Sequence, residues 1–476
     1  MTSTGERPWR ERALLPTLIL LASSTAVVAS LGAPLVPRIA EVHHVSLSSA
    51  QWILTVTFLA GAVMSPLVGR LGGGRHRRLV IIGGLVAVLV GGVLAALPLG
   101  FGAMVLGRVL QGVGLSLTPL AIAVAREVVS EERRAAAIAT LSVTTVAGAG
   151  LGYPIASLIV DRYGVSAAYW VGAALAAATL AAAVLVIPPN LTAEWRRLDY
   201  VGAVLLGAGA GGLLLSVSQA HAWGWTAPST IGVASGSVVA LGLWTRWTLS
   251  QADPLVDLRL ATRTGVLGAN LTALLAGCGM YMLITLVILV VQAPSSTAYG
   301  LGHSVAVAGL MLVPFSVASV LGNRATRSLV RFVRPDALLP IGCALFLLAT
   351  LVLAAFRGHL WGCALAMLIG GLASGFSFAA MPGLIVRFVP PAETGSAMGF
   401  NQVLRYLGFS TGSALVLAIL QVFAKPGGGL TSSGFTAAAL ASSAVSGLAA
   451  VVALWLARGV ARDTITNRHS HVRMRW

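Results

Sequence analysis

Apolar stretches of about 20 residues recur along the whole chain, separated by short polar segments. That length is what an α-helix needs to cross the hydrocarbon core of a bilayer. The polar segments are too short to hold a separate soluble domain. The pattern predicts an all-α polytopic membrane protein with fourteen spans, at residues 13–36, 49–69, 79–98, 101–125, 136–160, 166–187, 200–220, 228–248, 266–292, 303–322, 336–356, 359–381, 395–421 and 434–457.

Basic residues gather in alternate connecting segments, as expected when Lys and Arg are retained on the cytoplasmic side of a membrane. If the N-terminus is cytoplasmic, most of the 31 basic residues fall on its side. Only Arg38, Arg162, Arg357 and Lys425 fall in outer segments, and Arg108 and Arg405 remain inside spans. We therefore expect a plasma-membrane protein with both termini in the cytoplasm.

The composition agrees with a membrane protein and narrows its partners. Hydrophobic residues make up 57% of the chain and charged residues 9%, which is far from the usage of a soluble domain. The formal charge of +17 is spread over loops and comes with no nucleic-acid motif, so we expect membrane lipids and no nucleic acid as partners. The three cysteines lack metal-ligand spacing, so no metal or other cofactor is expected.

Two features suggest an internal repeat. The basic loop "GRLGGGRHRR" after the second span has a counterpart, "GNRATRSLVRFVRP", after the tenth span. Arg108 in the fourth span has a looser echo in Arg405 of the thirteenth. We expect a six-helix bundle at 1–190, two additional helices at 191–260, and a second six-helix bundle with a cytoplasmic tail at 261–476, acting as a monomer.

Arg108 lies inside an apolar run, in "RVLQGVG". An arginine at the bilayer centre costs roughly 2.5 to 3.5 kcal/mol on insertion scales, so we expect it to face the bundle interior or a wet cavity. Gln111 shares its helical face and could share its hydrogen bonds, while Gly112 permits close helix contact. The alternative is that Arg108 extends along its helix to a membrane interface.

Two further motifs concern helix packing and gating. Gly148 and Gly152 are four residues apart and Pro154 follows, which predicts a close helix contact with a kink; the alternative is packing alone. The loop after the second span predicts a cytoplasmic gate, and the alternative is that its charges only set topology. The gate residues are Gly69, Arg70, Arg77 and Arg78, whose cations can meet helix C-termini or anionic lipid.

These motifs carry a family resemblance. "RVLQGVG", "AGLGYPIASLI" and "SPLVGRLGGGRHRRLV" resemble the fourth-span, fifth-span and loop motifs of the major facilitator superfamily. With "RLDYVGA" and "FNQVLRYLGFSTGSAL", the chain is most similar to its fourteen-span drug:proton antiporter branch. The resemblance implies a major facilitator fold and a transporter that exchanges drugs for protons.

The chain departs from that family at charged positions. In the loop motif, Gly73, Gly74 and His76 stand where the family carries aspartate, arginine and glycine, so a charge latch is expected to be missing or rebuilt. Ser23 and Ser24 stand near the place of the family's first-span aspartate. All fourteen acidic residues fall in predicted loops or at span ends, so the proton carrier expected by analogy is sought at two span ends, Glu127 and Asp161.

The absence of acidic residues from the middle of the predicted spans also bears on the substrate. Two intramembrane arginines favour a neutral or anionic amphiphile over a lipophilic cation. Polar residues in these spans could line a substrate cavity, and the alternative is that each bonds to a neighbouring helix. For Arg405 the alternative is a bridge to backbone carbonyls. The candidate cavity residues are Gln51, Trp52, Asn270, Tyr281, Asn401, Gln402, Arg405 and Tyr406.

We therefore predict a secondary transporter that exports small amphiphilic compounds by alternating access, with protons as the coupling ion by family analogy. One alternative is uptake or facilitated passage of a particular metabolite. Another is a polytopic membrane enzyme, which would need acids or histidines gathered at one place. They are scattered here, and no phosphate-binding P-loop is present.

Overall fold

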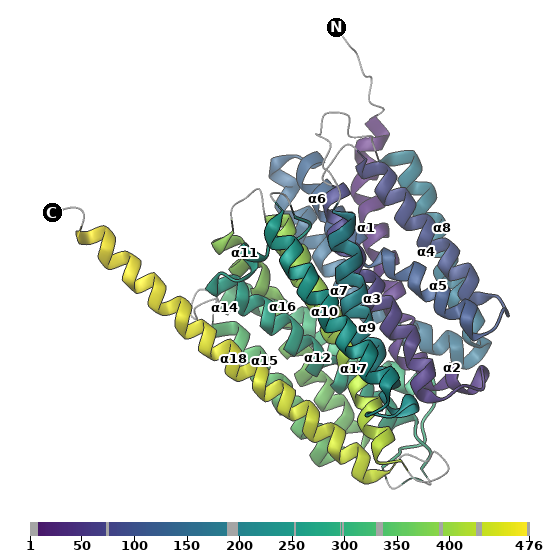
Figure 1. Cartoon of the computed structure of the whole chain (residues 1–476). Helices are drawn as coiled ribbons and strands as arrows, with labels where there is room; N and C mark the ends of the chain where they lie inside the picture. The colour runs from purple at the N-terminus through teal and green to yellow at the C-terminus, as the bar shows by residue number, and fades with distance from the viewer. Residues whose placement is uncertain are drawn as a thin grey trace.

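The computed structural model describes residues 8–72, 76–187, 199–251, 254–295, 297, 299–329, 337–389, 394–424 and 431–473. Within these ranges the chain forms α-helices and one short 3-10 helix, and no strand. The all-α class is thereby confirmed for the described residues. The helices form one elongated bundle, from which the last helix extends at one side (Figure 1).

The first half of the chain, which we call the N-terminal half, folds as one group of helices. α4 packs against α5 and α8, α1 packs against α7 and α8, and α3 packs against α5. A left-handed glycine, Gly164 with φ of +84°, joins α7 directly to α8. The elements are α1 (Pro8–Ser30), η1 (Ala33–Leu35), α2 (Val36–Val42), α3 (Leu47–Gly72), α4 (Arg77–Ala96), α5 (Phe101–Gly114), α6 (Leu117–Val128), α7 (Glu131–Tyr163) and α8 (Val165–Val186).

Two helices, α9 (Tyr200–Trp223) and α10 (Pro228–Ser250), follow as a pair. α9 also contacts α3 and α17. Asp199 organises the start of the pair: its carboxylate accepts from Gly202 N at 2.7 Å and from Trp247 Nε1 of α10 at 2.9 Å. The aspartate of "RLDYVGA" thus caps one helix and holds the other.

The last part of the chain, the C-terminal half, forms a second group of helices. α12 is buried along nearly its whole length and packs against α16, α17 and α18, while α14 and α15 both pack against α16. The elements are α11 (Leu258–Ala261), α12 (Thr264–Gln292), α13 (Val305–Leu310), α14 (Leu312–Leu329), α15 (Leu338–Phe356), α16 (Leu360–Phe388), α17 (Thr394–Val422) and α18 (Ser432–Arg473).

The two halves meet along two seams. α3 packs against α17 on one side, and α7 packs against α13 and α14 on the other. In Figure 1 the α9–α10 pair lies across the front of the α3–α17 seam. The central residues of α3 and α17 are therefore enclosed between the halves.

Large apolar side chains cover the outside of the bundle. Val204 of α9, Val238 of α10 and Val451 of α18 are 68%, 60% and 64% exposed. Ten helices in the described residues are long and apolar enough to cross a membrane. This supports a polytopic membrane protein, while the count of fourteen spans stays a prediction.

Three predicted spans are not continuous helices. The first, at 13–36, breaks after Ser30, where α1 gives way to η1 and α2. The fourth breaks between α5 and α6 at Leu115 and Ser116, and the tenth breaks between α13 and α14 at Met311. In both cases a proline, Pro119 or Pro314, occupies the first turn of the second helix. The first turn tolerates proline because its N–H groups have no intrahelical partner.

The end of the chain also differs from expectation. The last span was expected to end at 457, but α18 continues as one helix of 42 residues to Arg473. At 1.5 Å per residue it is about 63 Å long, roughly twice the thickness of a hydrocarbon core. Much of the predicted cytoplasmic tail therefore continues the last helix.

Candidate transport site

Arg108 of α5 is fully enclosed by neighbouring helices, with 0% of its surface exposed. Its Nε donates to Ile53 O of α3 at 3.2 Å, and its Nη1 donates to Val28 O of α1 at 3.2 Å. Nη1 also donates to Gln111 Oε1 at 2.8 Å. The guanidinium thus joins three helices through carbonyl and amide oxygens and does not reach the surface of the bundle.

The contact with Val28 explains how a cation is stable here without a carboxylate. α1 ends at Ser30, and Gly32 and Pro34 follow at its break from η1. The last carbonyls of a helix lack intrahelical partners and carry partial negative charge. Arg108 therefore satisfies one of these carbonyls and places its charge where the helix dipole favours it.

Glycines in α5 and α7 allow close contacts with α3 and α1. A Cβ on Gly112 would lie 2.4 Å from Thr57 O of α3, and a Cβ on Gly152 of α7 would lie 2.4 Å from Ser30 Oγ of α1. Both glycines thus permit the contacts of α5 and α7 with their neighbours. Pro154 is buried within α7. Gly148 lies in α7 where the surroundings of the side chains fall outside the described structure.

Arg405 of α17 has a different setting. Its side chain is half-buried, and its Nη2 donates to Gln402 Oε1. Its Cζ lies 5.1 Å from the ring centroid of Phe378 of α16. Its Nε is shielded from solvent and has no hydrogen-bond partner among the described residues. No backbone carbonyl in the described chain accepts from it, so the carbonyl bridge given as its alternative is not seen there.

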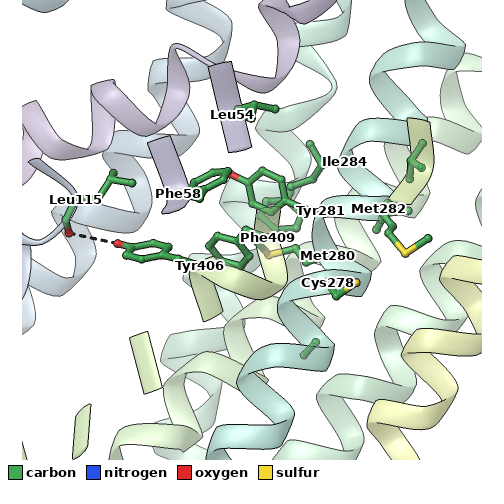
Figure 2. Close-up of a cluster of buried hydrophobic side chains, with 14 of the residues drawn as sticks. Leu54, Phe58, Leu115, Cys278, Met280, Tyr281, Met282, Ile284, Tyr406 and Phe409 are labelled. Atoms are coloured by element: carbon green, nitrogen blue, oxygen red, sulfur yellow. Dashed lines mark hydrogen bonds between the residues drawn. The ribbon is translucent and has the colours of Figure 1, made fainter. Parts of the chain in front are cut away.

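Between the two arginines lies a cluster that we call the aromatic layer, formed by Phe58 of α3, Tyr281 of α12, and Tyr406 and Phe409 of α17. The ring centroids of Tyr281 and Phe409 are 4.6 Å apart and stacked, and those of Phe58 and Tyr281 are 4.8 Å apart and edge-on. Figure 2 shows these rings converging from helices of both halves. All four side chains are at most 9% exposed, so the layer closes the centre of the bundle in this conformation.

Three hydrogen bonds also cross between the halves. Tyr406 Oη donates to Leu115 O at 3.2 Å (Figure 2). Ser410 Oγ donates to Thr55 O at 3.4 Å, and Gln292 Nε2 donates to Pro34 O at 3.0 Å. All are bonds between neutral groups, each worth about 1 kcal/mol net. Such contacts hold a closed state without making it irreversible.

The remaining predicted cavity residues separate into two kinds. Asn401 Nδ2 donates to Ala269 O at 3.0 Å and to Asn270 Oδ1 at 3.2 Å, so this pair joins α17 to α12. Gln51 is buried, and its Nε2 has no partner among the described residues. Trp52 beside it is half-buried. The asparagines thus make the helix-to-helix bonds given as their alternative.

The structure describes only some of the residues of the predicted cytoplasmic gate. Arg78 Nη2 donates to Val184 O in the last turn of α8 at 2.6 Å, which places a cation at a helix C-terminus. Arg77 is buried, and Gly69 is exposed at the end of α3. The side chain of Arg70 lies outside the described structure, as do Gly73 and Gly74.

The described structure places the side chain of one of the two candidate proton carriers. Asp161 is exposed in the last turn of α7, and the side chain of Glu127 in α6 lies outside the description. Across the described residues the one ion pair joins Arg38 to Glu41 on the surface. A role for either acid in coupling stays a prediction.

Several residues at the centre were not expected from the sequence. Phe58, Phe409 and Phe378 look like ordinary apolar residues until three helices bring them together. Tyr153 of α7 is also buried, and its side chain lies close to that of Tyr281 of α12. The motif around Pro154 indicated that this stretch is important for helix packing. No local sequence pattern could predict that Tyr153 contacts a residue of the C-terminal half.

A helical bundle with an apolar exterior, built from two halves that meet around a buried centre, is an architecture typical of secondary transporters. The chain belongs to the Major Facilitator Superfamily, whose pattern it matches over residues 18–413. The predicted family is thereby confirmed. Since this is a family of transporters, the enzyme alternative is set aside.

Relatives of known name extend over most of the chain. It is 27% identical over 472 residues to the multidrug efflux pump LfrA of Mycolicibacterium smegmatis, covering 95% of this chain and 89% of that protein. It is 29% identical over 387 residues to the cephamycin export protein CmcT of Amycolatopsis lactamdurans, covering 78% and 77%. The relatives are thus efflux-type transporters of small molecules.

Among solved structures, the chain is similar to a crystal structure of a POT peptide transporter in complex with sulfate. The TM-score is 0.66 at 16% identity, and the match covers 97% of this chain and 96% of that one. At this identity the likeness concerns the fold alone.

Proposed function

We propose that this protein exports small amphiphilic compounds, neutral or anionic, across the plasma membrane by alternating access. The observation that carries the proposal is the aromatic layer between the halves, which closes the centre through contacts of α3 with α12 and α17. Rocking of one half against the other would open the layer to each side in turn. The names of LfrA and CmcT support export as the direction.

The proposal includes an arrangement in the membrane. Fourteen spans comprise two six-helix bundles, at 1–190 and 261–476, with an inserted pair at 191–260. Both termini lie in the cytoplasm, as the alternation of basic residues favours. The transporter acts as a monomer, with membrane lipids around its apolar exterior.

Proton exchange is the coupling implied by the family, and uniport is the second candidate. The observation that favours uniport is the placement of all fourteen acidic residues in connecting segments or at span ends. A proton carrier must titrate within the pathway, and carboxylates are the usual carriers.

Purified protein in liposomes tests both candidates. The vesicles hold a pH-sensitive dye, and amphiphiles are added under an imposed pH gradient. Export coupled to protons predicts substrate-dependent proton flux, and would direct the search for a carrier to Glu127 and Asp161. Substrate movement without proton flux establishes uniport or exchange. Failure of every amphiphile to cross, in protein that is folded and inserted, would contradict the proposal.

A further inference from the structure

Arg405 is a half-buried cation whose hydrogen-bonding capacity is largely unused. A guanidinium offers five N–H donors, and the described structure shows one bond, from Nη2 to the Gln402 amide. Nε is shielded from solvent and has no acceptor in the described chain. Buried donors are nearly always satisfied, so an unsatisfied one indicates a missing acceptor.

Nothing in the described structure balances its charge. The one described ion pair is the surface pair of Arg38 and Glu41, and no acidic residue lies in the middle of a predicted span. The contrast with Arg108, which has two backbone carbonyls as acceptors, is direct. An anionic ligand would supply both the acceptor and the opposite charge that Arg405 lacks.

Aromatic rings adjoin the guanidinium on one side. Phe378 lies under its Cζ at 5.1 Å, and Phe409 meets Phe378 edge-on with ring centroids 6.2 Å apart. Phe409 in turn stacks on Tyr281 of the aromatic layer. A planar ring entering beside Arg405 would find other rings to stack on at the centre of the bundle.

We propose that Arg405 is the anion-recognition residue of the substrate site, and that its ligand is an aromatic carboxylate. The carboxylate accepts from the guanidinium, and the ring of the ligand packs against Phe378 and Phe409. The layer is closed in this conformation, so the ligand enters when the halves part. This inference rests on the proposed function and specifies the substrate class of the same site.

The test compares three ligands that share a ring and differ in charge: 1-naphthoate, 1-naphthamide and 1-naphthylmethylamine. Binding to the full-length protein in lipid nanodiscs is followed by tryptophan fluorescence. Wild type is expected to bind the anion at least about tenfold more tightly than the amide, the order of a charge-assisted hydrogen bond. Arg405→Gln is expected to remove that preference, and Arg405→Lys to keep part of it.

Arg357→Gln is the matched control. Arg357, which follows the last residue of α15, also lies 5.1 Å from a ring, that of Phe435. Its guanidinium donates to Thr436 Oγ1 and Ser432 Oγ in the first turns of α18. Its removal deletes the same charge and the same kind of ring contact elsewhere, and should leave the anion preference unchanged. Phe378→Leu tests the ring contact without touching a charge, and should weaken all three ligands together.

The outcomes are distinct. A wild-type preference for the amine, or an anion preference that survives in folded Arg405→Gln, would overturn the assignment. The same ligands are then followed across liposome membranes. Binding that depends on Arg405 without transport would contradict the exporter proposal and leave the anion site in place. Transport of the amide and the amine with no anion preference would support the exporter proposal and contradict the assignment of Arg405 as an anion site.

Discussion

Two arginines lie in the apolar interior, each hydrogen-bonded to a glutamine three residues away. Arg108 is 0% exposed, and its donors meet the carbonyls of Val28 and Ile53. Arg405 is half-buried, with its Nε unpartnered in the described structure and a ring beside it. The same residue type thus serves helix assembly in one half, and in our proposal serves ligand recognition in the other.

Whether an intramembrane arginine can bind a substrate depends on how many of its N–H donors already have acceptors in the protein. The sequence makes Arg108 the stronger candidate, because its motif matches a known family and that of Arg405 is a looser echo. The hydrogen-bond acceptors seen in the structure make Arg405 the stronger candidate for substrate binding. Donors that are already satisfied by backbone carbonyls have little left to offer a substrate, whereas unsatisfied ones do.

The largest expected effect follows replacement of Arg108. Arg108→Ala removes the donor to Val28 O, Ile53 O and Gln111 Oε1 together. Ile53 O still accepts from Thr57 Oγ1 at 2.6 Å, so Val28 O and Gln111 Oε1 are the acceptors that lose their donor. Each buried acceptor left unsatisfied costs about 1–3 kcal/mol, so the loss of stability should reach about 2 kcal/mol or more. Arg405→Gln should lose about 1 kcal/mol or less, since it gives up one bond. Thermal unfolding in nanodiscs measures the stability of both variants. Equal losses would contradict the larger structural role assigned to Arg108.

A second effect concerns the helix contact that brings Arg108 to α3. Gly112→Ala places a Cβ 2.4 Å from Thr57 O and 2.7 Å from Ala60 Cβ, and overpacking of this kind costs about 1–3 kcal/mol. Gly102→Ala in the same helix meets no atom within 4 Å. The control variant should be neutral or slightly stabilising. Similar unfolding temperatures for the two variants would contradict the close contact.

A third prediction concerns Asp199, which lies outside the central region. Asp199→Ala removes the acceptor for Gly202 N and Trp247 Nε1 and should cost about 1–2 kcal/mol, as lost helix caps do. The anion preference should not change, because the α9–α10 pair has no part in the site. Thermal unfolding and ligand titrations of the same Asp199→Ala protein measure its stability and its preference for the anionic ligand. A changed preference would contradict the prediction and show that a loss of stability is enough to disturb the site.

The smallest effect is a shift between closed and open states. Tyr406→Phe removes one bond between the halves, from Tyr406 Oη to Leu115 O. A loss of about 1 kcal/mol from the closed state favours the open one by roughly fivefold. Spin labels at Leu99→Cys and Phe356→Cys, which are exposed on different halves, report the distance distribution. The native cysteines 278, 343 and 363 are buried, which keeps background labelling low. An unchanged distribution would remove Tyr406 from the closing contacts.

Much of the fold could be predicted from the sequence, because span length and loop charge are set locally by the membrane. The helix breaks after Ser30, at Leu115 and at Met311 were missed, although a proline follows each of them, at Pro34, Pro119 and Pro314. An apolar run hides a break, since hydrophobicity continues across it. The continuation of α18 was missed for the opposite reason: the helix persists where the apolar pattern ends.

The site could be predicted only in part. The cost of burying an arginine identified Arg108 and Arg405 as unusual, and "FNQVLRYLGFSTGSAL" identified the helix that carries much of the centre. The convergence of Phe58, Tyr281 and Phe409 from three helices depends on tertiary packing, for which no local pattern exists. The acceptors of each guanidinium depend on the same packing, so the sequence could not show which of the two arginines keeps unused donors.

Thermal unfolding with and without 1-naphthoate, for Arg108→Gln and Arg405→Gln side by side, tests the division of roles most directly. The account predicts that Arg108→Gln unfolds at a lower temperature than wild type but is still stabilised by the ligand. It predicts that Arg405→Gln unfolds near the wild-type temperature and is no longer stabilised. The reverse pattern, with the ligand effect lost in Arg108→Gln and kept in Arg405→Gln, would contradict it.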